Sequence, residues 1–299
     1  MNMQRLIAAE FFKLRKRMMT WVVTALMIGI IVLLYSILWS ISGRAGGYFD
    51  QELGRRVAYQ ELRRGLFLEA GVPFALQIIA GFGALLAIIL AAGAAGSEYA
   101  WGTVRLMATA SSGRLRLLTA RLVVVCVLIA AGTLLAVAVA LAYSTIITTY
   151  SGGADFAFLT RGFAWDQFLA YLRTLLVLAP YVSLAFAAAV IGRSTLAGVG
   201  AGIVAAFLEP LISGLMRLGG ARWEDVPNYL IAANRQVVLL QNELPSALPS
   251  FGPSERDLAQ RGAHSPEAAA LILALYTISF MAVAFVVYRR RDITSSSNG

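Results

Sequence analysis

Six long apolar segments constrain this chain more than any other feature of its sequence. They occupy residues 18–41, 72–95, 122–144, 175–191, 196–215 and 268–288. An α-helix rises about 1.5 Å per residue, so about 20 apolar residues cross the roughly 30 Å of hydrocarbon in a bilayer. Continuous apolar runs differ from the alternating strands of membrane β-barrels. The sequence therefore predicts an all-α, polytopic membrane protein with six transmembrane helices in a single domain, residues 1–299.

The 25 Lys and Arg residues are divided unevenly among the segments that join the apolar runs. Thirteen lie in the two terminal segments and in the second and fourth connections, with only three acidic residues. The rest of the chain carries twelve basic and thirteen acidic residues, including Glu209 in the fifth apolar segment. Short positive segments stay in the cytoplasm, so we expect a plasma-membrane protein with both termini cytoplasmic. The net charge of +9 follows this topology and does not predict nucleic-acid binding. The abundance of alanine, glycine and arginine in the chain favours a prokaryotic source.

Residues 1–17 have the pattern of an amphipathic helix lying in the membrane interface. Apolar residues recur at helical spacing from Met3 to Leu14, while basic residues can reach lipid phosphates. We expect this interfacial helix to include Phe11, Lys13 and Arg15. The alternative is a simple positively charged anchor whose periodicity is fortuitous.

The segments on the other side predict peripheral structure without an independent core. The loop at 43–71 has oppositely charged residues three or four positions apart, which favours an exposed, salt-bridged helix. Residues 216–267 contain five prolines, so a lid over the bundle is expected there in place of a second domain. Within the bundle, small residues four positions apart, such as Gly198 and Gly202, favour close helix packing. The short connection at 192–195 predicts a tight helical hairpin.

Glu209 and Pro210 stand side by side in the fifth apolar segment. A carboxylate within the membrane is costly, and proline breaks helices, so these residues could mark a helix break that lines a pathway. The alternative is that the helix ends near Phe207 and leaves Glu209 among the headgroups. Arg173, near the start of the fourth segment, is a candidate partner for the Glu209 carboxylate.

The connection at 96–121 has the most specific pattern on the expected cytoplasmic side. Ser97 is a favourable N-cap and Glu98 suits a first helical turn, followed by Trp101 and Arg105. This pattern predicts a short helix, held between two spans, that docks onto a cytosolic partner. The alternative is a loop retained by its positive charges. The chain has no P-loop, HExxH or GxSxG motif, so we expect neither catalytic residues nor a bound metal or cofactor.

These features together resemble the membrane subunits of type-2 ATP-binding-cassette exporters, especially the permeases of bacitracin resistance. The N-terminal sequence EFFKLR, residues 10–15, is similar to the interfacial helix of that family, and Glu98-x3-Gly102-Thr103-x-Arg105 resembles its coupling segment. Ser112-Gly113-Arg114 stands where the family commonly has Pro-x-Ser-Arg. Leu208-Glu209-Pro210 and the six-span topology also match.

The resemblance implies a transporter in which ATP and Mg are bound by a separate cytosolic ATPase subunit. It assigns Glu98, Gly102, Thr103 and Arg105, with Trp101 beside them, to the contact with that ATPase. A second membrane subunit, identical or homologous, is implied as well. The nearly uncharged spans favour an amphipathic or lipid-like cargo. Two other functions stay open at this point, a gradient-driven carrier using Glu209 and a non-transporting scaffold or immunity protein.

Overall fold

The structure is a computed structural model, and it describes residues 2–48, 65–100, 114–151, 157–219, 223, 225–242, 255–260 and 262–290. Within these ranges the secondary structure is helical, with no strand. Six helical segments are long and apolar enough to cross a membrane: Met18–Ser42, Leu68–Ser97, Leu115–Tyr150, Arg161–Gly192, Thr195–Leu218 and Pro266–Arg290. Each contains one of the predicted spans, so the all-helical fold and the six membrane-length helices are confirmed.

The first three helical segments differ from simple spans in their ends and regularity. The N-terminal helix α1 (Met3–Lys16) is followed by α2 (Met18–Tyr48). The second span consists of α4 (Leu68–Ile78), a π-helical turn η1 (Ile79–Gly83) and α5 (Ala84–Ala100). The third helix, α7 (Arg114–Tyr150), has 37 residues, or about 55 Å of rise. It continues past the apolar core of the span because helical hydrogen bonding does not require apolar side chains.

The remaining chain forms two long helices, two short ones and a last span. Helix α8 (Arg161–Gly192) is followed by α9 (Thr195–Leu218), a 3-10 turn η2 (Val226–Tyr229) and α10 (Ile231–Leu240). The short α11 (Glu255–Gln260) precedes α12 (Pro266–Arg290). Thr160 caps α8 by accepting a hydrogen bond from the Phe163 amide, and Pro180 lies inside α8.

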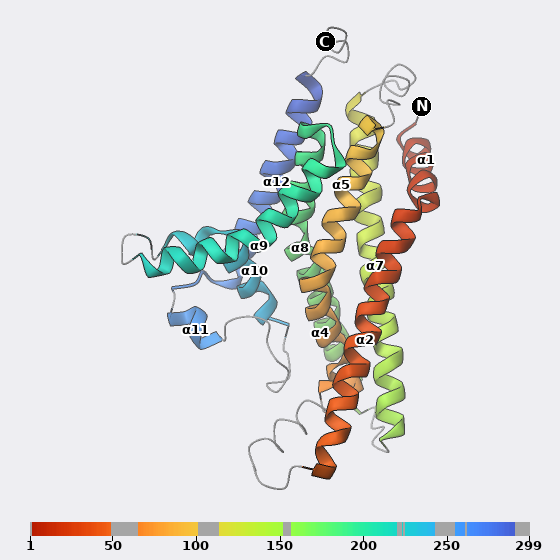
Figure 1. Ribbon diagram of the computed structural model, residues 1–299, viewed down its shortest axis with the longest axis vertical. Coiled ribbons are helices and arrows are strands. Elements are labelled where there is room, and N and C mark those ends of the chain that lie inside the picture. Colours follow the sequence, from red (N-terminus) through yellow and green to blue (C-terminus); the bar gives the residue numbers. More distant parts are fainter. Residues whose placement is uncertain are drawn as a thin grey trace.

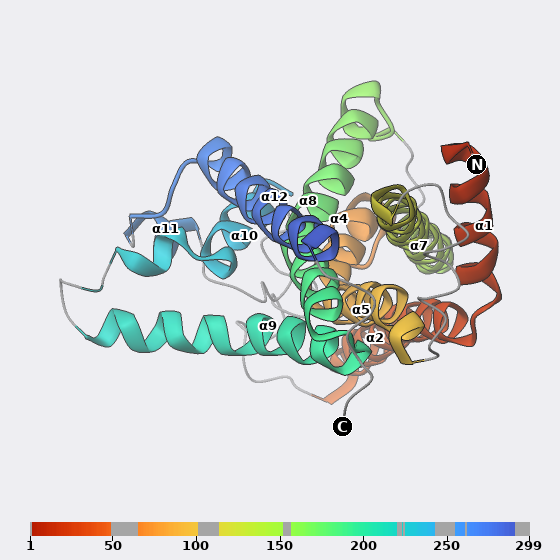
Figure 2. The same cartoon turned by 90° about the horizontal axis from the view of Figure 1, so that it is seen from above.

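Helix α8 lies near the centre of the bundle, with α4 and α5 beside it (Figures 1 and 2). Helix α12 lies on one side of α8, and α2 and α7 lie beyond α4 and α5. Helix α1 and the end of α12 are at the same end of the bundle, as expected if both termini share one side of the membrane. Figure 1 also shows α9 leaving the bundle axis in its second half, where it runs outward beside α10 and α11.

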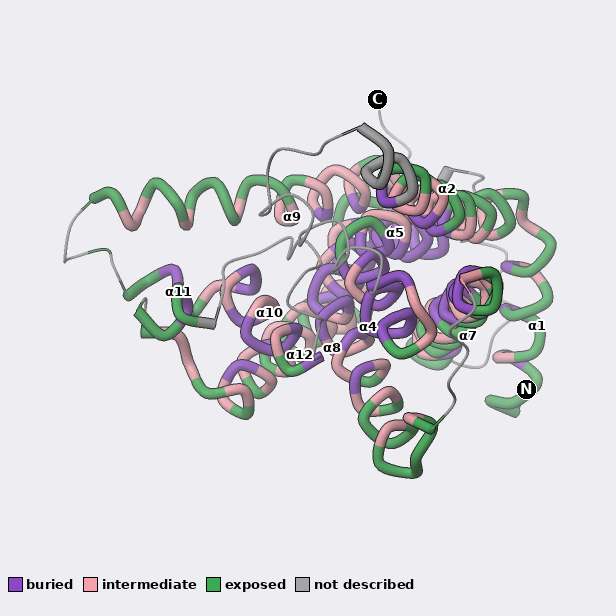
Figure 3. The backbone as a smooth tube through the Cα atoms, turned by 90° about the horizontal axis from the view of Figure 1, so that it is seen from below, coloured by how far each residue is buried: buried purple, intermediate pink, exposed green. Residues whose placement is uncertain are grey.

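Burial is concentrated in the second and fourth spans (Figure 3). The apolar window of the second span is 78% buried and that of the fourth 61%, against 17%, 11% and 11% for the windows of α2, α9 and α12. Buried side chains form one large cluster around α5, α8, α10 and α12 and another around α2, α4 and α7. The exposed sides of α2, α9 and α12 are therefore the apolar surfaces that lipid or another membrane subunit can cover.

Small residues allow α9 to approach α8 and α5 closely. A Cβ atom at Gly198 would stand 2.6 Å from the Ala185 carbonyl oxygen and 2.7 Å from the Cβ atoms of Ala189 and Ala92. A Cβ atom at Gly202 would stand 2.5 Å from a methyl carbon of Ile88. The predicted close packing of these small residues is confirmed.

The predicted tight hairpin between α8 and α9 is also confirmed. Arg193 has a left-handed conformation with a φ of 51°, and Ser194 caps α9 by accepting a hydrogen bond of 3.1 Å from the Leu196 amide. Near the end of α5, Gly96 lies against this turn, since its Cβ would be 2.3 Å from the Thr195 nitrogen. The end of α5 thus contacts the start of α9 through backbone atoms.

Candidate functional site

Helix α1 has the amphipathic character that its sequence predicts. Leu6, Leu14 and Glu10 are buried, whereas Phe11 and Phe12 are 37% and 59% exposed. The last turn of α1 contains Lys13, Arg15 and Lys16. Their positive charges interact favourably with the negative end of the helix dipole. The Arg15 carbonyl accepts a hydrogen bond of 2.8 Å from the Trp21 indole at the start of α2. The helix is therefore held at its end and presents aromatic side chains outward.

A buried ion pair joins α1 to the beginning of α7. Glu10 and Arg121 are 5% and 3% exposed, and Arg121 Nε lies 3.4 Å from Glu10 Oε2. Lys13 Nζ lies 3.7 Å from the other carboxylate oxygen. The side chains of Leu6, Leu117 and Ala120 pack together beside this pair. Separating α1 from α7 would leave a buried charge without its partner. The ion pair therefore favours the contact between these two helices.

The junction between α1 and α2 makes a second contact, with the end of α5. The Arg17 guanidinium donates to the Gly93 carbonyl oxygen at 3.4 Å and also to the Ser97 hydroxyl. Helix α5 leads into residues 101–113, and α7 begins directly after them. The N-terminal region therefore contacts both helices that flank the predicted coupling segment.

The predicted ATPase-coupling residues are only partly within the described structure. Glu98 lies in the last turn of α5, and Trp101, Gly102, Thr103 and Arg105 lie outside the described residues. The expected N-cap at Ser97 is wrong, because α5 continues through it to Ala100. The apolar run that precedes Ser97 keeps the chain helical, and its hydroxyl is used by Arg17.

The structure at Glu209 and Pro210 matches neither of the two interpretations drawn from the sequence. Helix α9 neither breaks there nor ends near Phe207, because it remains helical to Leu218 with Pro210 inside it. Figure 1 shows that it bends, as expected where proline removes a backbone donor. The Glu209 carboxylate accepts a hydrogen bond of 3.0 Å from the Ala232 amide at the start of α10. Glu209 thus caps α10, which has no capping side chain of its own.

The hypothesis that Arg173 pairs with Glu209 is wrong. Arg173 Nη1 donates a hydrogen bond of 2.9 Å to the carbonyl oxygen of Gln241, the C-cap residue of α10. Glu209 contacts the opposite end of the same helix. Both residues therefore hold α10, one at each end, where their charges match the helix dipole: a carboxylate at the N-terminus and a guanidinium at the C-terminus.

A polar cluster that sequence analysis missed surrounds Glu209. The Arg235 Nη2 atom donates a hydrogen bond of 2.9 Å to the Ala80 carbonyl oxygen in η1. Tyr181, which is 1% exposed, interacts electrostatically with both Glu209 and Arg235. Arg235 is a single charge in the apolar stretch 229–240, and that signal in the sequence could have identified it.

The cluster coincides with departures from regular helix geometry in three spans. Ala80 lies in a π-helical turn, Tyr181 directly follows Pro180 in α8, and Glu209 directly precedes Pro210 in α9. Each irregularity changes the backbone hydrogen-bond ladder locally, so polar groups become available to side chains. The cluster is thus a polar centre where four helical elements meet.

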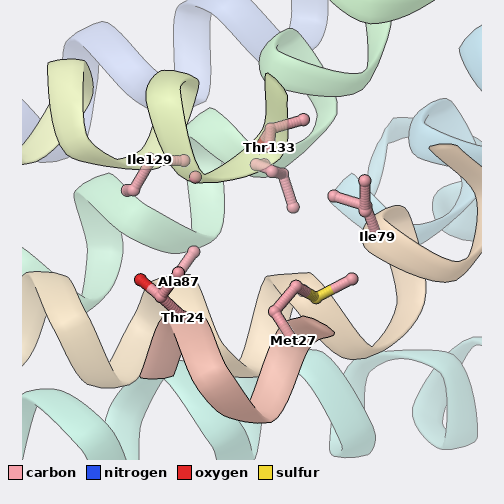
Figure 4. A pocket seen from close by; sticks show the side chains of 9 residues that line it. Thr24, Met27, Ile79, Ala87, Ile129 and Thr133 are labelled. Atoms are coloured by element: carbon pink, nitrogen blue, oxygen red, sulfur yellow. The ribbon is translucent and has the colours of Figure 1, made fainter. Parts of the chain in front are cut away.

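A small cavity lies beside the π-helical turn (Figure 4). It has a volume of about 50 Å³ and is bounded by residues of α2, η1, α5, α7 and α8. Figure 4 shows Thr24 and Met27 of α2 facing Ile79 of η1 and Ile129 and Thr133 of α7 across it. Gly132 and Gly83 complete part of its wall. A space of this volume is too small to hold an amphipathic molecule.

Part of the expected lid at 216–267 lies outside the described residues, and the apolar stretch 229–240, which the sequence allows to lie on or dip into the membrane, contains α10. Ile231, Val237, Val238 and Leu239 of α10 are buried and belong to the large core cluster, and Ala232 is buried as well. Helix α10 contacts α8, α9 and α12. Helix α10 is therefore packed between these spans and is part of the bundle.

The six membrane-length helices, with α10 packed among them, define a polytopic helical membrane protein. The sequence profile of a family described as "protein of unknown function (DUF2705)" matches residues 48–294. The chain belongs to this family. A search of curated proteins found no match to the chain.

Proposed function

We propose that the chain is the membrane subunit of an ATP-driven exporter of the type-2 class. A separate cytosolic ATPase binds ATP and Mg, a second copy or a homologous subunit completes the pathway, and both termini face the cytoplasm. The cargo is an amphipathic or lipid-like molecule. The observation that carries the proposal is that the N-terminal region, through Glu10 in α1 and Arg17 just after it, contacts both helices flanking the coupling segment.

This arrangement supports a mechanical route from an ATPase to the bundle. A push on residues 101–113 would tilt the end of α5 and the start of α7, and α1 would move with them because Glu10 holds Arg121. The end of α5 lies against the backbone at Thr195, so its movement reaches α9 without an intervening flexible side chain. Packed helices transmit such displacements as rigid elements.

The proposal is tested by recovering partners from membranes with the wild-type chain and an E98R/R105E variant. We expect a P-loop ATPase with the wild type, loss of that ATPase with the variant, and ATPase stimulation by the reconstituted wild-type complex. Arg116→Glu is the matched control, because Arg116 is exposed on α7 outside the proposed motif. Absence of any ATPase with abundant, folded wild-type protein would reject the exporter.

A gradient-driven carrier is the second candidate, and the environment of Glu209 favours it. A carboxylate that interacts with Tyr181 and Arg235 among the spans is the kind of group that ion-coupled carriers use. Proton-driven flux by the purified chain alone, abolished by Glu209→Gln, would support this candidate. Flux that requires the ATPase and ATP would support the exporter.

A further inference from the structure

A second, larger cavity lies between the outward-running half of α9 and α10. Its volume is about 320 Å³, and it is bounded by residues 210, 213, 214 and 217 of α9 and 232, 233 and 236 of α10. It is separate from the small cavity beside η1, because the two share no residue. A space of this size accommodates a polar headgroup.

The wall that α9 contributes to this cavity is polar and basic. Ser213 and Arg217 line the cavity and follow Glu209 at four-residue spacing, which places all three on one face of the helix. Arg217 Nη2 donates a hydrogen bond of 3.0 Å to Asn228 Oδ1, which orients the guanidinium at the wall. Gln236 faces the cavity from α10.

Among the described residues that line this cavity, Arg217 is the one charged residue, so the described wall carries a guanidinium and no carboxylate. The nearby Glu209 carboxylate is occupied by the Ala232 amide and interacts with Arg235, so it opposes an anion less than an isolated carboxylate would. Guanidinium groups bind phosphate through paired, charge-assisted hydrogen bonds.

The opposite face of the same half of α9 is an exposed apolar stripe. Leu211, Leu215 and Leu218 are 59%, 60% and 84% exposed and recur at helical spacing. Trp223, just beyond the helix, is 49% exposed and contacts Gly219. An apolar stripe and a tryptophan beside a basic wall are the features of a helix that lies in a lipid interface.

We infer that the cavity between α9 and α10 binds the phosphate headgroup of an anionic lipid from the lipid layer that covers the Leu211–Leu218 stripe. Arg217 pairs with the phosphate and Gln236 donates a hydrogen bond to it, while the Ser213 hydroxyl, which donates a hydrogen bond of 2.8 Å to the Glu209 carbonyl oxygen, lines the wall beside them. The inference goes beyond the proposed function and does not depend on it, because binding requires neither an ATPase nor transport.

The test is a titration of the purified full-length chain, in detergent, with dioleoylphosphatidylglycerol, followed by native mass spectrometry of the bound lipid. We expect a saturable site that Arg217→Gln weakens about tenfold or more, as the loss of charge-assisted hydrogen bonds requires. Arg217→Lys should lie between the two, since it keeps the charge without the planar fork. Arg161→Gln, at the exposed start of α8, is the matched control. Wild-type affinity in Arg217→Gln would overturn the site.

A second variant tests the cavity without changing charge. A Cβ atom at Gly214 meets no atom within 4 Å, so Gly214→Leu can enter the cavity without a backbone clash. It should also lower affinity about tenfold. Gly200→Leu is the control, because Gly200 is equally open but lies outside the cavity. Unchanged binding in folded Gly214→Leu would contradict the location.

Two further probes distinguish the source of the phosphate. Dioleoylglycerol has the same acyl chains without a phosphate, and its binding with equal affinity would overturn headgroup recognition. Inorganic phosphate at millimolar concentration should not displace the lipid. Displacement by it would overturn the lipid assignment in favour of a free anion.

Discussion

Arg235 in α10 donates a hydrogen bond of 2.9 Å to the carbonyl oxygen of Ala80, which lies 155 positions earlier in the chain. Ala80 lies in the π-helical turn of the second span, and Glu209 interacts with the same guanidinium from the fifth. A short helix outside the six apolar segments is therefore bound to the interior of the bundle by charge and hydrogen bonds. Movement of α10 must be accompanied by a change in at least two spans.

Glu209 should determine whether the first turn of α10 is stable. Glu209→Leu removes the acceptor for the Ala232 amide and the negative charge near Arg235, so amide hydrogen exchange in residues 231–240 should increase. Loss of a cap costs about 0.5–2 kcal/mol, which corresponds to roughly twofold to thirtyfold faster exchange by local opening. Hydrogen-exchange mass spectrometry measures this directly.

Glu209→Gln keeps an acceptor oxygen and should produce a smaller increase. Glu69→Leu is the control, because Glu69 is an exposed carboxylate in the first turn of α4. Equal exchange in wild type and Glu209→Leu would show that α10 is held without its cap.

Replacing one member of the Glu10–Arg121 ion pair should destabilise the protein more than replacing both members. Among the described residues, Arg121→Met leaves Lys13, at 3.7 Å, as the cation beside the buried Glu10 carboxylate, so apparent stability should fall by about 3–5 kcal/mol. Unfolding of the purified chain in detergent, followed by circular dichroism, provides the measurement. The double variant E10L/R121M should recover much of the loss, because it removes both buried charges.

Arg116→Met is the appropriate comparison for this pair. Arg116 lies on the same helix but is exposed, so its replacement should change stability by less than about 0.5 kcal/mol. Equal effects of replacing Arg116 and Arg121 would mean that burial of the pair contributes nothing to the docking of α1.

Gly198 should tolerate no side chain, in contrast to Gly200 two positions away. Gly198→Ala places a methyl group within 2.7 Å of Ala185, Ala189 and Ala92 atoms and should cost about 1–3 kcal/mol by overpacking. Gly200→Ala meets no atom within 4 Å and should be neutral or stabilising, because alanine favours helix. Thermal unfolding of the two variants under identical conditions makes the comparison. A Gly198→Ala variant as stable as Gly200→Ala would exclude the close contact between α9 and α8.

Sequence analysis was most successful where a feature depends on neighbouring residues. The amphipathic helix α1 follows from the periodicity of Leu6 and Leu14, and the hairpin between α8 and α9 from the short connection around Arg193. The Ser97 cap was predicted wrongly because local propensity ignored the helical run leading into it. The pairing of Arg173 with Glu209 was wrong because the position of α10 could not be read from the separate segments.

The number of membrane-length helices and their approximate centres can be read from the sequence alone, because hydropathy summed over about 20 residues is a local quantity. For Glu209 the sequence leaves two interpretations open, a costly carboxylate among apolar spans or a carboxylate among the headgroups. The three-dimensional packing shows that Glu209 binds the start of α10 and that Arg235 binds the Ala80 carbonyl oxygen. These contacts depend on how helices distant in sequence pack side by side, and that arrangement follows from side-chain shape across the whole bundle.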